Sequence, residues 1–348
     1  MHFKTLASLV LLSFSYLVAG APSNCSSDSG PSPTTTDSAL SNPSPSKGGN
    51  PTFSGSGPIN VTCPVGGSVS GPQFVIYSDM WVDGVLPDPS KVEGYTVFAL
   101  SFLTAHGAVD QAQNWASQDD STRKSLKSKY SSAGIKLIVS AFGSEEKPTT
   151  KRSDPVKTAN DMAGWVKQYD LDGIDVDYED FDAMGKEDGS AEEWLISFTK
   201  ALREQLPQGQ YVLTHAPIAP WFSPEVSKSG AYLTVHKNVG DMIDWYNMQF
   251  YNQQDYSDCT TLLSKSKAAS KASVFEISKS GVDLNKIVIG KPGIASDADD
   301  GYMEPKTLAT CLSQAKQKGW NAGAMVWEYP HADSQWIKDA RGDAFPMN

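Results

Sequence analysis

From about residue 73 onward, short apolar runs alternate with longer stretches in which apolar residues recur every three or four positions. The short runs predict eight strands, at residues 74–77, 96–103, 136–141, 174–178, 211–214, 246–251, 286–290 and 322–327. Strands that are apolar at nearly every position are typical of a parallel sheet covered on both faces. Eight such strands with intervening helices over about 270 residues predict a single α/β domain, a (β/α)8 or TIM barrel, at residues 70–345.

The start of one connecting helix can be read directly. Asp154 stands at an N-cap position and Pro155 at the first turn, and Ala159, Met162 and Val166 follow at helical spacing. A doubly wound open sheet shares the alternation of strands and helices. It is disfavoured because no G-x-G-x-x-G joins the first strand to its helix.

The first 58 residues have a different texture. Residues 1–20 combine Lys4, an apolar run at 5–18 and small residues at 18–20, which predicts a secretory signal peptide. This run is too short for a membrane span, and no other stretch is apolar enough for one. We therefore expect a secreted, extracellular protein, a setting that includes association with a cell wall.

Residues 21–58 consist mainly of Ser, Pro, Thr and Gly, and bury too little apolar surface to offset the entropy of ordering. They predict a disordered, glycosylated stalk that links the signal peptide to the barrel. Asn24 and Asn60 begin N-glycosylation sequons.

Secretion makes disulfides plausible, and the four cysteines allow three pairings. We favour Cys259 with Cys311 because both lie in the C-terminal half. Cys25 would then pair with Cys63 and fix the stalk to the domain. No cysteine spacing is that of a metal site, and no nucleotide motif occurs, so we expect neither a metal nor another cofactor.

The net charge of the chain limits the classes of ligand that we expect it to bind. The formal net charge of −11 argues against nucleic acid, because phosphate binding needs clustered Lys and Arg. A neutral sugar polymer is compatible with such an acidic surface.

The fourth predicted strand carries the chemistry. Asp172 precedes it, and Asp175, Asp177 and Glu179 then alternate with apolar residues. Alternation places the last three on one face, which is the barrel interior if Ile174 and the other apolar residues pack against helices. Desolvation and mutual repulsion of buried carboxylates raise at least one pKa, as a general acid requires.

This spacing resembles the D-x-x-D-x-D-x-E signature of family 18 glycoside hydrolases, chitinases nearest to the plant and fungal class III type. The resemblance implies a retaining mechanism in which the 2-acetamido group of the substrate attacks the anomeric carbon. Glu179 would be the general acid and base, Asp177 would orient the acetamido group, and Asp175 would tune Asp177. Asp172 would belong to the substrate-binding residues.

Other strand ends fit the resemblance. Tyr251 would donate to the acetamido oxygen and Gln249 would assist at the same subsite. Trp327 would form the floor under the cleaved sugar, where an aromatic face suits a pyranose ring. Tyr77 would line the same subsite. His215 ends the fifth strand, either at the groove or as a satisfied core residue.

One motif departs from the family pattern. The third strand usually ends Ser-x-Gly-Gly, whereas Ser140 and Gly143 here enclose Phe142 in place of the first glycine. The phenyl ring would either alter the turn or enter the groove, which puts substrate preference in doubt.

Only about a dozen residues separate Pro292 from the next predicted helix, so the inserted domain of processive relatives is missing. This favours an open groove and a monomeric, endo-acting chitinase that binds chitin or N-acetylglucosamine oligosaccharides. Trp81, Trp221 and Tyr302 are candidate outer platforms. The alternatives are an endo-β-N-acetylglucosaminidase of N-glycan cores and a non-catalytic lectin on the same barrel.

Overall fold

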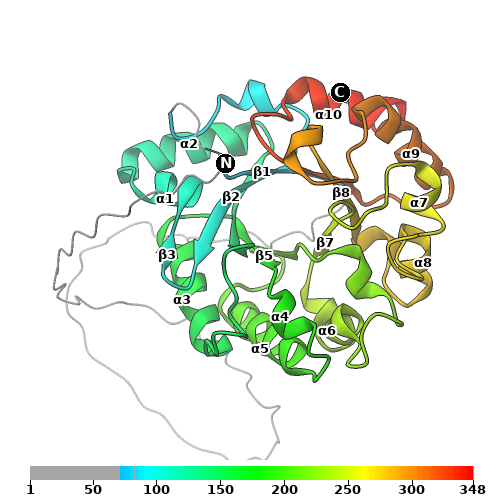
Figure 1. Cartoon of the computed structure of the whole chain (residues 1–348). Coiled ribbons are helices and arrows are strands. Elements are labelled where there is room, and N and C mark those ends of the chain that lie inside the picture. Colours follow the sequence, from blue (N-terminus) through cyan, green and yellow to red (C-terminus); the bar gives the residue numbers. More distant parts are fainter. Residues whose placement is uncertain (1–70, 81–83, 348) are drawn as a thin grey trace, which may run out of the picture. The chain divides into compact units, whose positions relative to one another are not determined.

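A computed structural model describes residues 71–80 and 84–347 of the chain (Figure 1). Several expectations concern residues outside these ranges: the signal peptide, the stalk, both sequons, Cys25, Cys63 and Trp81.

Eight parallel strands form a closed barrel at the centre of the described residues (Figure 1). They are β1 (Gln73–Ser78), β2 (Val97–Thr104), β4 (Lys136–Gly143), β5 (Gly173–Tyr178), β6 (Val212–His215), β7 (Trp245–Gln249), β8 (Ile287–Pro292) and β9 (Gly323–Trp327). Because β1 pairs with both β2 and β9, the sheet closes on itself. A short strand, β3 (Gly107–Ala108), pairs antiparallel with β2. The predicted (β/α)8 fold is confirmed.

Helices surround this barrel (Figure 1). They are α1 (Asp110–Ala116), α2 (Asp120–Ser132), α3 (Pro155–Gln168), α4 (Phe181–Met184), α5 (Ser190–Gln205), α6 (Ala231–Val239), α7 (Cys259–Leu263), α8 (Val274–Lys279), α9 (Pro305–Gln317) and α10 (Ser334–Arg341). None of the helices in the described ranges is long and apolar enough to cross a membrane.

Helix α3 begins where the sequence predicts. The Asp154 carboxylate accepts a hydrogen bond from the Lys157 amide, and Pro155 is the first helical residue. Ala159, Met162 and Val166 are buried on the barrel side. Local capping and apolar spacing therefore agree, as they should where a helix covers a sheet.

The register of the strands determines which side chains meet. Every residue of β5 is buried, and Asp175 lies level with Ser140 on β4 and Thr214 on β6. In a parallel barrel all carboxyl ends of the strands open at one mouth. Polar residues near the ends of neighbouring strands are thus brought into one layer.

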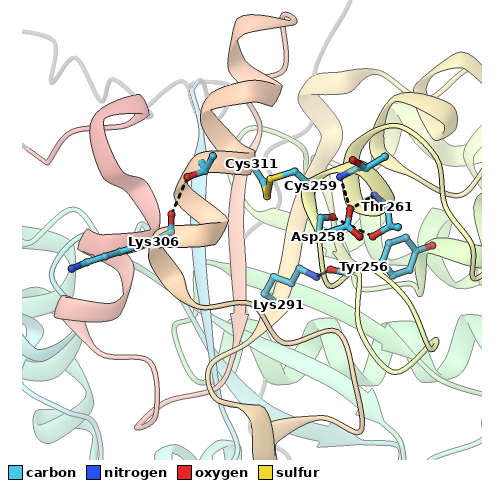
Figure 2. The surroundings of a disulfide bond; sticks show 9 residues. Tyr256, Asp258, Cys259, Thr261, Lys291, Lys306 and Cys311 are labelled. Carbon is cyan, nitrogen blue, oxygen red and sulfur yellow. Dashed lines mark hydrogen bonds between the residues drawn. A yellow bond between two sulfur atoms is a disulfide. The ribbon is translucent and has the colours of Figure 1, made fainter.

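A disulfide joins Cys259 at the start of α7 to Cys311 in α9, as the sequence analysis favoured (Figure 2). The adjacent Asp258 caps α7, because its Oδ1 accepts from the amides of Thr260 at 2.7 Å and Thr261 at 2.9 Å. The bond closes a sequence separation of 52 residues.

Replacing both Cys259 and Cys311 by alanine should lower the free energy of unfolding by about 2–4 kcal/mol, because the unfolded chain regains the freedom of a long loop. Urea unfolding with and without reductant measures this. Reductant should shift the midpoint of the wild type by more than that of the double variant; equal midpoints for wild type and double variant without reductant would show that this crosslink contributes nothing.

Candidate active site

Strand β5 delivers three carboxylates to the mouth of the barrel. Ile174 and Val176 are fully buried on the helix side, while Asp175 and Asp177 alternate with them and face inward. Glu179 follows directly after the strand and is half-buried. The row of inward-facing carboxylates that the alternation of a strand predicts is therefore present.

Asp175 lies deepest and is fully buried. Four side chains on four other strands donate to it: Tyr77 at 2.7 Å and Ser140 at 2.9 Å to Oδ2, and Thr214 at 2.5 Å and Asn247 at 3.0 Å to Oδ1. Burial raises the pKa of Asp175, and the four donors oppose that rise. This set of donors is the environment of an ionised carboxylate.

Asp177 and Glu179 form a coupled pair above it. Burial raises the pKa of both carboxyls, and the negative charges of Glu179 and Asp175 raise that of Asp177 further. The Gln249 amide donates to Asp177 Oδ1 at 3.0 Å and to Glu179 Oε1 at 3.3 Å. Because two crowded carboxyls cannot both ionise readily, the pair retains a proton at a pH where isolated carboxyls are charged.

These groups open into a pocket of about 190 Å³. Its walls come from the ends of most of the strands: Asp79, Phe102, Ser144, Asp177, Glu179, Gln249, Tyr251, Asn252, Asp297 and Trp327. The structure thus brings together five of the residues singled out from sequence, namely Asp177, Glu179, Gln249, Tyr251 and Trp327.

Tyr251 follows β7 and is 6% exposed. Burial, together with the charges of Asp177 and Glu179, raises the pKa of its phenol well above the usual 10.0. The hydroxyl therefore stays protonated and can donate a hydrogen bond to a ligand in the pocket.

An aromatic floor lies beside the carboxylates. The rings of Trp327 and Phe102 stack with centroids 5.9 Å apart and an interplanar angle of 26°. Gly143 permits this, because a Cβ there would lie 3.0 Å from the Phe102 ring. The sequence analysis missed Phe102: its strand was predicted, but nothing in the apolar run distinguishes it from core residues.

Phe142 alters the turn and does not enter the groove. Its φ of 78° breaks the strand alternation, and its side chain is 1% exposed. The ring packs against Trp194 at 5.6 Å and Phe198 at 5.3 Å, both on α5. The departure from the family glycine therefore adds to the helix layer and leaves the pocket free.

Two residues that the resemblance assigns to substrate binding, Asp172 and Tyr77, are not among those that line the pocket. Asp172 lies at the opposite end of β5 from Glu179, where its Oδ2 accepts from the Leu137 amide at 2.7 Å and its Oδ1 pairs with Lys127 at 3.0 Å. Its role is to hold the bottom of the barrel. Tyr77 is 2% exposed, and its hydroxyl donates to Asp175 Oδ2 at 2.7 Å.

Two further candidates belong to the core. His215 is fully buried between the hydroxyls of Thr199 and Tyr232, each at 3.2 Å, and burial lowers its pKa to about 3. Trp221 is 5% exposed and stacks on Tyr232 at 5.8 Å, so it does not offer an outer platform. Tyr302 is not among the residues that line the pocket.

The wall around Trp327 carries acidic residues that sequence reasoning also missed. Glu328 accepts from the amides of Asp79 at 2.8 Å and Met80 at 3.1 Å. Burial raises the pKa of Glu328 to about 7 and that of Asp79 to about 6. Asp297 pairs with His331 at 2.7 Å. These residues lie at or just beyond strand ends, in segments without periodicity.

No three His, Cys, Asp or Glu side chains in the described ranges are arranged to hold a metal.

Comparison with known proteins agrees with this site. The model of the glycosyl hydrolases family 18 matches residues 73–338. The chain is 28% identical over 163 residues to Endochitinase 3 of Metarhizium anisopliae, covering 45% of this chain and 47% of that protein. It thus spans about half the length of that relative.

Two further proteins are similar over more of their length. A chitinase of Enterococcus faecalis is 23% identical over 255 residues, 68% of this chain and 71% of that protein. The crystal structure of a GH18 chitinase from Pseudoalteromonas aurantia superposes with a TM-score of 0.65 at 27% identity, covering 77% of this chain and 99% of that one. Because the family model matches nearly the whole barrel, including all eight strands and the carboxylates of β5, the chain belongs to the glycosyl hydrolases family 18.

Proposed function

We propose that this protein is a chitinase that hydrolyses β-1,4 linkages between N-acetylglucosamine units. One observation carries the proposal: Asp177, Glu179 and Tyr251 line the same pocket as Trp327. Carboxyls of raised pKa, a phenol donor and a ring face are the groups that a substrate-assisted glycosidase needs. The chitinases similar to this chain give the proposal independent support.

The first step is protonation. The Asp177–Glu179 pair retains a proton because burial raises the pKa of both carboxyls, and Glu179 donates this proton to the glycosidic oxygen as the C1–O bond breaks. The 2-acetamido carbonyl oxygen of the same sugar attacks C1 and forms an oxazolinium ring. The Glu179 carboxylate then takes a proton from a water molecule, and this water attacks C1 and opens the ring. Glu179 is again protonated, and the configuration at C1 is retained.

Asp177 and Tyr251 act on the acetamido group in this scheme. Positive charge develops on its nitrogen as the oxazolinium forms, and the neighbouring Asp177 carboxyl stabilises that charge. The protonated Tyr251 phenol donates to the acetamido oxygen and directs it at C1. Asp175 lies below them, where its four donors fix the position of its carboxyl group.

The proposal includes an endo mode of cleavage by a secreted monomer. Residues 293–304 are the whole connection between β8 and α9, too short for a domain that would wall the groove. A chain of sugars can therefore lie across the mouth and extend in both directions. Secretion is inferred from the N-terminal sequence pattern alone.

Glu179→Gln should reduce kcat/KM on chitin pentamer by at least about 10²-fold, because the amide cannot donate the proton. Asp172→Asn is the matched control from the same sequence motif. It should leave kcat/KM close to that of wild type and lower stability by about 1 kcal/mol, since only the Lys127 pair is lost. Products are measured by mass spectrometry.

The same assay with a high-mannose glycoprotein separates the alternatives. Cleavage of the chitin oligomer alone supports the proposal. Cleavage of the glycoprotein alone would assign the enzyme to N-glycan cores, and binding of chitin oligomers without any cleavage would make the protein a lectin.

Gln249→Met should move the alkaline limb of the pH profile of kcat/KM to higher pH. The Gln249 amide donates to both Asp177 and Glu179 and so favours their ionised forms. Without it the pKa of Glu179 rises, and the acid stays protonated to a higher pH. A limb that moves to lower pH would contradict this arrangement. The Asp172→Asn profile, which should be unshifted, is the reference.

A further inference from the structure

Lys291 is a buried cation close to the site that the proposed chemistry does not use. It lies near the end of β8 and is fully buried. Its Nζ donates to three main-chain carbonyls, those of Phe250 at 2.8 Å, Tyr256 at 2.6 Å and Gly301 at 2.9 Å. Figure 2 shows the side chain reaching toward Tyr256. All three ammonium protons are thus used.

The three carbonyls belong to segments next to Tyr251 in sequence or in space. Phe250 precedes it, Tyr256 lies further along the same loop between β7 and α7, and Gly301 packs directly against it. A Cβ at Gly301 would lie 2.6 Å from Tyr251 Cα, which shows how closely the two segments approach. One ammonium group therefore joins two points of the Tyr251 loop, on either side of Tyr251, to the segment of Gly301 that packs against it.

The loop needs such support because its backbone is strained. Asn252, Gln254 and Tyr256 have φ values of 62°, 61° and 69°, in the left-handed region that residues other than glycine rarely adopt. Such a conformation is unfavourable and persists only where its surroundings impose it. The conformation that places Tyr251 in the pocket is thus held by its contacts and not by local preference.

Asp300 supplies a second set of contacts to the same loop. Its carbonyl accepts from the Asn252 amide at 3.2 Å, and its carboxylate accepts from the amides of Gln253 at 3.2 Å and Gln254 at 2.9 Å. Lys291 on β8 thus contacts the loop from the barrel, and Asp300 contacts it from the segment that precedes Gly301.

Burial of a lysine is costly, so its presence calls for a reason. Desolvation lowers the pKa of Lys291 to about 7, against the opposing charges of Asp255 and Asp300. An apolar side chain would pack at this position without that cost. We propose that Lys291 is a positioning residue whose ammonium holds Tyr251 at the catalytic pocket. The proposal rests on the proposed function, since Tyr251 acts only if the acetamido group of a substrate is its partner.

A double-mutant cycle tests whether Lys291 acts through Tyr251. Kinetic constants on chitin pentamer are measured for wild type, Lys291→Met, Tyr251→Phe and the double variant. Lys291→Met should lower kcat by about 10²-fold, the scale for misplacement of a catalytic group by about 1 Å, with KM nearly unchanged. In the Tyr251→Phe background the same change should cost less than about threefold, because the hydroxyl that it positions is already gone.

Lys286→Met is the matched control. Lys286 also donates to two main-chain carbonyls, Gly240 at 2.6 Å and Ile243 at 2.7 Å, but it precedes the opposite end of β8. Its loss should lower stability and leave kcat unchanged. If Lys291→Met does not fold, Asp300→Ala replaces it in the cycle, with the same expected dependence on Tyr251.

Two results overturn the proposal, and they are distinguishable. Wild type that fails to cut the pentamer contradicts the proposed function and this inference with it. If wild type is active and the losses in kcat of Lys291→Met and Tyr251→Phe multiply in the double variant, the inference alone is contradicted. Lys291 would then contribute only to general stability.

Discussion

The burial of Asp175 is the constraint on which the rest of the barrel mouth depends. A carboxylate at zero exposure would be strongly destabilising if it had no partners. Donors from β1, β4, β6 and β7 offset that cost, and they can do so only if these strands keep one register around β5. The hydrogen bonds that offset the cost of burying Asp175 therefore also fix the strand ends that form the pocket.

Asp177 and Glu179 have few hydrogen-bond donors as a result. Most of the donors in the layer below are directed at Asp175, and Gln249 is shared between the two upper carboxyls. Burial raises the pKa of both carboxyls, and the charges of Glu179 and Asp175 raise that of Asp177 further, which keeps an acid proton at the mouth. Burial also raises the pKa values of Asp79 and Glu328 beside Trp327. The described residues that line the pocket are acidic, polar and aromatic and include no lysine, arginine or histidine.

Much of the fold could be predicted from the sequence, because it depends on regular periodicity. All eight barrel strands appear as apolar runs, and α3 begins at its Asp154 cap. The carboxylates of β5 were identifiable for the same reason, since a period of two needs no knowledge of the partners. The Cys259–Cys311 pairing was chosen from position along the chain and is present.

The remaining features depend on single backbone angles or on contacts distant in sequence. Phe142 points outward because one φ is positive, which an apolar run does not reveal. Asp172 belongs to the sequence signature, yet six strand residues separate it from the mouth. Phe102, Asp79 and Lys291 owe their positions to neighbours on other strands, and residue type alone carries no sign of those neighbours.

Cleavage assisted by the substrate's own acetamido group determines the stereochemistry of the product. Wild-type enzyme is mixed with chitin pentamer, and proton NMR follows the anomeric signals of the new reducing ends before they equilibrate. Because two displacements at C1 restore its configuration, the β anomer should form first. Initial release of the α anomer would mean a direct attack by water and would contradict the roles assigned to Asp177, Glu179 and Tyr251.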